Sequence, residues 1–155
     1  MRFSNPPESS PWDNHHFGPP PCYTLESADD IYRPLFDLCF DYFNGTQVQG
    51  DIYEFGTYKG YTARLISENM ALRNWEGKLH LFDSFEGLPE MDNSCDLNSY
   101  EVAVNKSWFK GQMKLHPGIV SAIAGALSQT IGPKKFVIHK GFYKDTLPKL
   151  VSDNK

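Results

Sequence analysis

The sequence predicts an α/β fold in which short parallel strands alternate with helices. Three short apolar runs, at residues 51–56, 78–83 and 135–141, are separated by segments with helical periodicity. Strands that alternate with helices form βαβ crossovers, and these crossovers build a parallel sheet covered by helices. The chain has 155 residues, a length that corresponds to about one domain, and it contains no internal repeat.

Residues 1–26 are predicted to form a proline-rich arm before a folded domain that spans residues 27–155. Six of the eleven prolines lie within residues 1–21, and this stretch has neither helical nor strand periodicity. The arm also contains the adjacent pair His15 and His16. We interpret this pair as solvated side chains rather than as metal ligands.

The first helix is expected to begin near residues 27–30, where Ser27 can cap backbone N–H groups and Asp29 and Asp30 favour the positive end of the helix dipole. Pro34 is expected either to kink this helix or to begin its regular part. Residues 44–45, Asn-Gly, are expected to end it. Its apolar residues at helical spacing are Ile31, Leu35, Leu38, Cys39 and Tyr42.

Three more helices are expected between and after the strands. The first spans residues 60–74, with Ala63, Ile66 and Met70 on one face. The second carries an apolar stripe and stops at residues 132–133, Gly-Pro. The stripe consists of Ile119, Ala122, Ile123, Ala126 and Leu127. The last helix opens at Asp145. Residues 84–117 form a long polar segment, and its part from residue 93 onward is either a lid over a binding site or an ordinary loop.

Composition excludes several classes of partner. The net charge is 15 − 19 = −4, so no basic excess favours nucleic acid. The longest near-apolar run, residues 119–127, is far shorter than the roughly 20 residues that span a bilayer. Cys22, Cys39 and Cys95 are widely separated and form no C-x-x-C pair, which is typical of free thiols in a reducing cytoplasm. We therefore expect a cytoplasmic protein without nucleic-acid or membrane partners.

The candidate ligand site lies at the carboxyl ends of the strands, where open parallel sheets bind ligands. The first turn, residues 54–60, reads E-x-G-x-x-x-G instead of the G-x-G-x-x-G that brings a pyrophosphate close to bare backbone. Glu54 would repel a pyrophosphate. It suits a ligand with positive charge, such as an ammonium or a sulfonium, and S-adenosylmethionine carries both.

Asp83 follows the second strand, 83 − 60 = 23 positions after Gly60. A carboxylate there can accept hydrogen bonds from both ribose hydroxyls of a nucleoside, whether NAD or S-adenosylmethionine. Structural interpretations stay open for each residue: a tight turn for the glycines, a helix cap or an ion pair for Glu54, an N-cap for Asp83. Their order on a βαβ pattern favours a nucleoside site.

Residues 50–60 and the run Leu-Phe-Asp-Ser-Phe-Glu-Gly-Leu-Pro-Glu at 81–90 resemble the macrocin O-methyltransferase family. Members are class I S-adenosylmethionine-dependent methyltransferases, known from antibiotic sugar tailoring. Residues 140–148 are also similar to the family, and the resemblance extends from about residue 31 to residue 148. It implies a Rossmann-like three-layer sandwich. It also implies methylation of a hydroxyl on a sugar or another small natural product.

The same resemblance implies which residues hold the cofactor. The turn after the first strand would bind the methionine part of S-adenosylmethionine, Asp83 the ribose diol, and residues 84–85 and 141–142 the adenosine side. The implied cofactor-binding residues are Glu54, Phe55, Gly56, Thr57, Tyr58, Gly60, Thr62, Asp83, Ser84, Phe85, Gly141 and Phe142.

One departure from the family concerns the acidic segments that supply its Mg²⁺ ligands and general base. They follow later strands and have no counterpart here, so no metal ligand and no catalytic residue is assigned. His80 and His139 lie within predicted strands and are interpreted as packed side chains. The sheet is expected to be truncated after the third strand and its helix.

A truncated sheet would leave the first strand as an edge with an unpaired ladder. The proline arm, a second copy of the chain or a C-terminal half is expected to cover it. Two other functions stay open beside methyl transfer to a small-molecule acceptor. One is a catalytically inactive nucleoside-binding or assembly module. The other is half of a dinucleotide-dependent oxidoreductase, against which Glu54 and the absence of a G-x-G-x-x-G motif argue.

Overall fold

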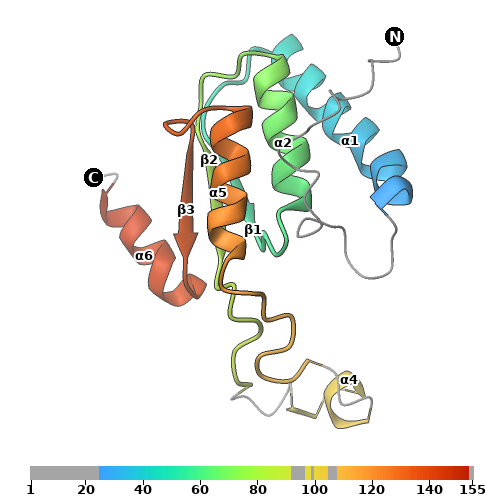
Figure 1. Ribbon diagram of the computed structural model, residues 1–155, viewed down its shortest axis with the longest axis vertical. Coiled ribbons are helices and arrows are strands. Elements are labelled where there is room, and N and C mark those ends of the chain that lie inside the picture. Colours follow the sequence, from blue (N-terminus) through green and yellow to red (C-terminus); the bar gives the residue numbers. More distant parts are fainter. Residues whose placement is uncertain (1–24, 92–96, 99, 105–107, 154–155) are drawn as a thin grey trace.

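The computed structural model describes residues 25–91, 97–98, 100–104 and 108–153 (Figure 1). The elements are α1 (Leu25–Gly45), β1 (Ile52–Phe55), α2 (Tyr61–Leu72), β2 (Leu79–Asp83), α4 (Tyr100–Ala103), α5 (Ile119–Thr130), β3 (Phe136–Lys140) and α6 (Tyr143–Asp153). Within these ranges the strands form one parallel sheet in the order β1-β2-β3. The predicted α/β class and the three strands are confirmed. The predicted arm lies outside the described residues, except for the first two residues of α1.

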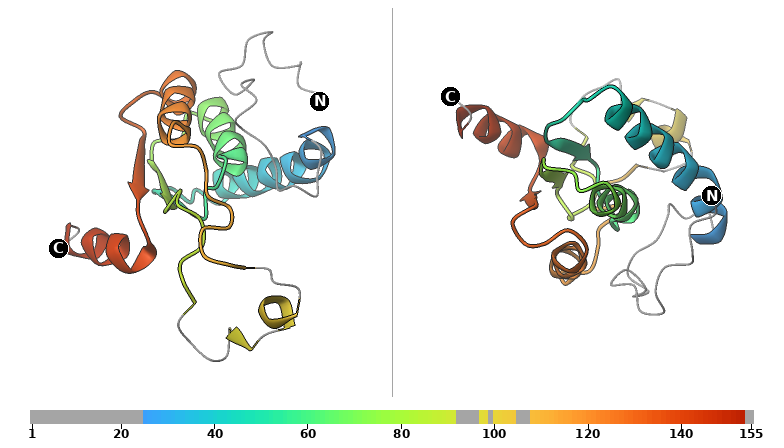
Figure 2. Two further views of the ribbon diagram at one scale, coloured as in Figure 1. Left: turned by 60° about the horizontal axis from the view of Figure 1, so that its bottom comes forward. Right: turned by 90° about the horizontal axis from the view of Figure 1, so that it is seen from above.

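Helices lie on both sides of this sheet. The helices α1, α2 and α5 lie on one side, and α6 extends from the other (Figures 1 and 2). Ile52 pairs with Leu79, and Leu79 pairs with Phe136. Because side chains alternate along a strand, Leu79 and Leu81 face α2 and α5, whereas His80 and Phe82 face the opposite side.

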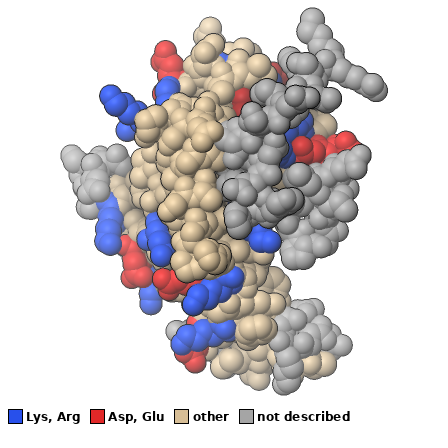
Figure 3. Space-filling model, viewed as in Figure 1, with Lys and Arg blue, Asp and Glu red and all other residues tan. Residues whose placement is uncertain are grey.

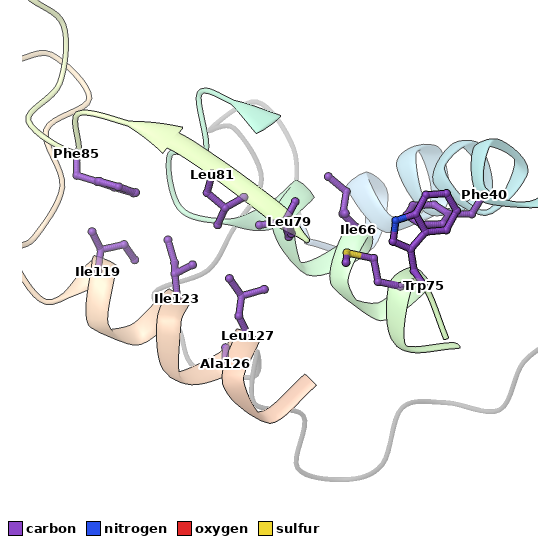
Figure 4. Packing of buried hydrophobic residues seen from close by; sticks show 12 residues of the cluster. Phe40, Ile66, Trp75, Leu79, Leu81, Phe85, Ile119, Ile123, Ala126 and Leu127 are labelled. Atoms are coloured by element: carbon purple, nitrogen blue, oxygen red, sulfur yellow. The ribbon is translucent and has the colours of Figure 1, made fainter. Parts of the chain in front are cut away.

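The core lies between β2 and the helices of the first side (Figure 4). Leu79 and Leu81 have no exposed surface and belong to one cluster with side chains from α1, α2 and α5. The predicted stripes on α2 and α5 are confirmed, with Ala122 only half-buried. Their buried members are Ala63, Ile66, Met70, Ile119, Ile123, Ala126 and Leu127. Phe40 and Trp75 extend the core toward α1, with ring centroids 5.5 Å apart.

The helix α1 forms as predicted, continues through Pro34 and ends at Gly45, but it does not pack through the apolar face that was expected. Most of the expected set is 53–66% exposed: Ile31, Leu35, Leu38 and Tyr42. The contacts to the rest of the domain come instead from Tyr32, Phe36, Phe40 and Phe43.

Polar pairs between α1 and α2 explain why a different face of α1 packs on the domain. Arg33 donates to Glu68 at 2.7 Å, and Asn69 donates to Asp37 at 3.0 Å. Arg73 also forms an ion pair with Asp41 at 2.5 Å. These pairs require residues 33, 37 and 41 to point toward α2, which turns the 31/35/38/42 stripe away from it.

The sheet face opposite α2 and α5 carries a layer of rings. Phe55 stacks on Phe82 at a centroid distance of 4.9 Å, and Phe82 stacks on His139 at 4.2 Å. Within the described ranges β1 pairs on one side only, as predicted for an edge strand. Two ring-bearing residues of this strand, Tyr53 and Phe55, are 43% and 53% exposed.

The thiol of Cys39 is free, whereas Cys22 and Cys95 lie outside the described residues, as do His15 and His16. In the part of the chain that the structure describes, no helix has the length and apolar character needed to cross a membrane.

A chain of polar contacts crosses the ring layer. His80 Nδ1 lies 2.9 Å from His139 Nε2, and His80 Nε2 lies 3.2 Å from Asp51 Oδ2. Partial burial, together with the positive charge that His80 can carry, lowers the pKa of His139 below its ordinary value of 6.5. Folding therefore favours neutral His139. The stability that this preference contributes is present above about pH 6.5 and is lost as the pH falls through the lowered pKa.

We expect the stability difference between the unaltered protein and His139→Gln to depend on pH. Relative to this variant, the unaltered protein should lose free energy of unfolding as the pH falls from 7.5 to 5, because only it has an imidazole to protonate at that position. Urea unfolding of both proteins at several pH values measures the difference. A constant difference, or one that grows toward low pH, would contradict the expectation.

Candidate functional site

The carboxyl ends of the three strands are joined at one edge of the sheet. The N–H of Gly56 donates to the carbonyl of Phe82 at 2.9 Å, and the N–H of Gly141 donates to the carbonyl of Asp83 at 3.0 Å. Gly56 and Gly141 have φ values of +87° and +142°, which residues with a side chain rarely adopt. These glycines place the turn after β1 and the beginning of α6 beside Asp83.

Asp83 connects this turn to the loop that follows β2. Its Oδ2 accepts from the N–H of Tyr58 at 2.7 Å, and its Oδ1 accepts from the N–H of Phe85 at 2.7 Å. A carboxylate offers about four lone-pair positions, so each oxygen can accept a second hydrogen bond. Asp83 is therefore held in place and keeps the capacity to bind two hydroxyl groups of a ligand.

Glu54 lies behind the same turn with one carboxylate oxygen unsatisfied. Thr62 donates its hydroxyl to Oε1. Thr57 lies near enough to influence the Glu54 carboxyl, but neither Glu54 Oε2 nor Thr57 Oγ1, both buried, has a partner with hydrogen-bond geometry among the described residues. Burial raises the pKa of Glu54, and the charge of Asp83 adds to the rise. A buried carboxylate oxygen without a donor is unfavourable, and a cationic ligand would satisfy it.

The beginning of α2 has positive electrostatic character, opposite to that of the Glu54 carboxylate. Gly60 is the N-cap residue with φ +78°, and no side chain caps the first turn. The first N–H groups of a helix lack intrahelical partners and carry the positive end of its dipole, so they attract anions. The turn therefore places a free helix N-terminus next to a buried carboxylate, which is an arrangement that suits the carboxylate and ammonium groups of an amino acid.

A cavity of about 1210 Å³ opens at this edge of the sheet. Half of the predicted site residues line it: Gly56, Tyr58, Asp83, Ser84, Gly141 and Phe142. Glu54, Thr57, Gly60 and Thr62 are not among the lining residues and belong to β1, the turn and the first turn of α2 behind it. Two predicted residues lie elsewhere. The Phe55 ring belongs to the layer on the other sheet face, and the Phe85 side chain is 5% exposed in the core (Figure 4).

The outer wall of the cavity is formed by residues of two segments, 84–90 without Phe85 and 110–114 without Gln112. The N–H of Leu88 donates to the carbonyl of Gln112 at 2.9 Å, and the N–H of Gly111 donates to the carbonyl of Leu88 at 2.9 Å. Gly87 has φ +82°, and a Cβ there would lie 2.4 Å from the Gln112 carbonyl oxygen, so only glycine fits. Lys110 pairs with Glu90 at 2.8 Å on this wall.

The two segments of this wall continue into a part of the chain that projects beyond the sheet, with α4 at its far end (Figure 1). Charged side chains of both signs gather where this segment leaves the domain (Figure 3). Lys110, Gly111, Met113 and Lys114 line the cavity, whereas Trp108 and Phe109 are 47% and 60% exposed and do not line it. Of the described residues between 93 and 117, only Lys110, Gly111, Met113 and Lys114 thus belong to the cavity wall, and residues 93–96, 99 and 105–107 lie outside the described ranges.

Tyr143 is a cavity residue that the sequence prediction missed. The helix α6 begins at Tyr143, two residues before the predicted start at Asp145, because the Phe142 carbonyl accepts from the N–H groups of Asp145 and Thr146. The earlier start turns Tyr143 toward the site. Other lining residues without a local sequence signal are Lys110, Met113, Lys114 and Lys144.

No group of three or more His, Cys, Asp and Glu side chains lies close enough to hold a metal ion within the described ranges. The described residues thus offer no magnesium site built from three or more such side chains. His80 and His139 do not line the cavity.

Comparisons with known proteins agree with this architecture. A family model described as macrocin-O-methyltransferase (TylF) matches residues 33–154. The crystal structure of a calicheamicin methyltransferase is similar with a TM-score of 0.61 and 18% sequence identity, over 80% of this chain and 50% of that chain. The chain thus spans about half the length of this neighbour, and at this identity the similarity concerns the fold. No curated protein matches the sequence.

Proposed function

Because the chain belongs to the macrocin-O-methyltransferase family, we propose that it binds S-adenosylmethionine and serves the transfer of its methyl group to a hydroxyl of a sugar or another small natural product. The observation that supports this most is the pair of opposite charges at the turn after β1. Glu54 Oε2 is buried without a donor, and the uncapped N-terminus of α2 lies a few residues away. An α-amino acid moiety complements both groups.

Different residues of the chain would bind different parts of the ligand. The N-terminus of α2 would hold the methionine carboxylate, Glu54 the ammonium and Asp83 the ribose diol. When bound, S-adenosylmethionine would supply a methyl group to the acceptor oxygen: the C–S bond would break with its electron pair left on sulfur, and the hydroxyl proton of the acceptor would leave to a base or to water. Three fixed points restrict the orientation of the ligand, and orientation is the main contribution of the protein to such a displacement.

The outer part of the cavity would receive the acceptor. Cavities for one small ligand usually measure about 300–1,000 Å³, and this one measures about 1210 Å³. Leu88 and Met113 contribute apolar surface to it, and Lys114 contributes charge. We assign no described residue to a metal or to the general base, and the cytoplasmic location expected from the thiols stays a prediction.

Calorimetric titration with S-adenosylhomocysteine tests the proposal. We expect micromolar binding that NADH does not displace, since Glu54 repels a pyrophosphate. Failure of the folded protein to bind S-adenosylhomocysteine would contradict it, and so would displacement by NADH. Transfer of labelled methyl groups to a panel of glycosylated natural products then separates a methyltransferase from an inactive cofactor-binding module.

The affinity for S-adenosylmethionine should rise with pH between 5 and 7. Glu54 has a raised pKa, and the ligand ammonium requires its ionised form, so protonation of Glu54 competes with binding as the pH falls. Glu54→Gln keeps the acceptor for Thr62 but removes the charge. It should weaken binding about tenfold or more at pH 7 and flatten the pH dependence.

Calorimetry in this pH range measures both effects, because the amino group of the ligand titrates only near pH 8. The exposed Glu76→Gln is the matched control and should behave as the unaltered protein does. If the affinity of Glu54→Gln still depends on pH, a group other than Glu54 causes the pH dependence, and the expectation is wrong.

A further inference from the structure

Tyr143 lies where the aromatic layer of the sheet meets the cavity. Its ring stands edge-on to Phe55, with centroids 5.8 Å apart at 87°. Its hydroxyl oxygen lies 3.7 Å from the position that a Cβ on Gly56 would take. The residue is 43% exposed and lines the cavity. The phenol oxygen therefore lies directly over the turn that the proposed function assigns to the methionine part of the ligand.

Two carboxylates influence this phenol electrostatically. Burial raises the pKa of Tyr143, and the charges of Asp83 and Glu54 raise it further. The phenol thus stays protonated at physiological pH and does not act as a base. A phenol hydroxyl can rotate about its C–O bond, so the oxygen can turn its lone pairs toward a cation that lies above Gly56.

Tyr143 offers the ligand a polar atom in addition to the carboxylate of Glu54. Under the proposed function Glu54 pairs with the ammonium, while the oxygen and the ring of Tyr143, which lines the cavity, offer further negative potential. S-adenosylmethionine carries a second positive charge on its sulfur, whereas S-adenosylhomocysteine has a neutral thioether there. Only the methylated form can use the additional potential.

We infer that Tyr143 makes the site prefer S-adenosylmethionine over S-adenosylhomocysteine, because its hydroxyl oxygen contacts the positively charged sulfonium group. This inference rests on the proposed function. It adds a selectivity residue outside the strand-end turns. Selection of this kind favours release of the product after methyl transfer, because the product loses the charge that Tyr143 recognises.

The test compares the affinities for S-adenosylmethionine and S-adenosylhomocysteine, measured by calorimetry, in the unaltered protein and in Tyr143→Phe. Removal of the hydroxyl should weaken S-adenosylmethionine binding roughly tenfold, the range for one interaction with a charged group, and leave S-adenosylhomocysteine binding within about twofold. Tyr143→Leu, which also removes the ring, should reduce the preference further. Tyr42→Phe, an exposed phenol on α1, is the control and should change neither affinity.

The outcomes separate this inference from the proposed function. If the unaltered protein binds both ligands and Tyr143→Phe weakens both equally, Tyr143 only shapes the cavity and the inference is wrong. An unchanged ratio of affinities in both Tyr143 variants also overturns it. If the unaltered, folded protein binds neither ligand, the proposed function fails and the inference fails with it.

Discussion

Asp83→Ala is expected to weaken S-adenosylhomocysteine binding by at least about 100-fold, since a carboxylate that accepts two hydroxyl groups makes two strong hydrogen bonds. The substitution also removes the acceptor for the N–H groups of Tyr58 and Phe85, which hold the turn against the following loop. Both effects act in the same direction. Calorimetric titration of the variant measures the loss.

Two further variants separate these effects. Asp83→Asn retains one acceptor oxygen and should lose less affinity than alanine does. Asp145→Ala removes another carboxylate, in the first turn of α6, which does not line the cavity. It should stay within about threefold of the unaltered protein, because surface substitutions change free energies by about 0.5 kcal/mol. Equal losses in Asp83→Ala and Asp145→Ala would show that Asp83 is not a specific ligand contact.

Leu81→Ala is expected to lower the free energy of unfolding by about 2–5 kcal/mol, the range for truncating a fully buried leucine. Leu81 has no exposed surface and lies between α2 and α5 (Figure 4). A domain is typically stable by about 5–15 kcal/mol, so this loss is a large fraction of the whole. Urea unfolding followed by circular dichroism measures it.

Leu38→Ala is the matched control, since the same side chain on α1 is 66% exposed. Its effect should be about 0.5 kcal/mol or less. A cost close to that of Leu81→Ala would mean that the outer face of α1 is buried in solution, contrary to the packing described above.

The sequence predicted the elements whose burial follows a single stripe. On α5 the residues 119, 123, 126 and 127 form one apolar face, and this face is buried in the core. On α1 two apolar faces lie side by side, and hydropathy does not distinguish them. The choice depends on Arg33, Asp37 and Asp41, whose partners lie about 30 residues later on α2. Such pairing is a tertiary property that local periodicity does not contain.

The site, too, has residues that the sequence predicted and residues whose position depends on tertiary contacts. Gly56, Asp83 and Gly141 were predictable because the carboxyl ends of parallel strands meet at one edge. The wall at residues 110–114 was not, because its position depends on backbone bonds between Leu88 and residues 111–112. Tyr143 was missed because the start of α6 depends on the carbonyl of Phe142 rather than on the capping residue Asp145.

The order of the strands also determines how the sheet can assemble. Ile52 pairs with Leu79, 79 − 52 = 27 positions away, and Leu79 pairs with Phe136, 136 − 79 = 57 positions away. Closing the longer connection costs about 0.7 kcal/mol more in chain entropy. The β1–α2–β2 unit also leaves the ribosome first. We therefore expect the sheet to grow in one direction, with β3 joining a preformed pair, so that the ligand site is completed only in the last step of folding.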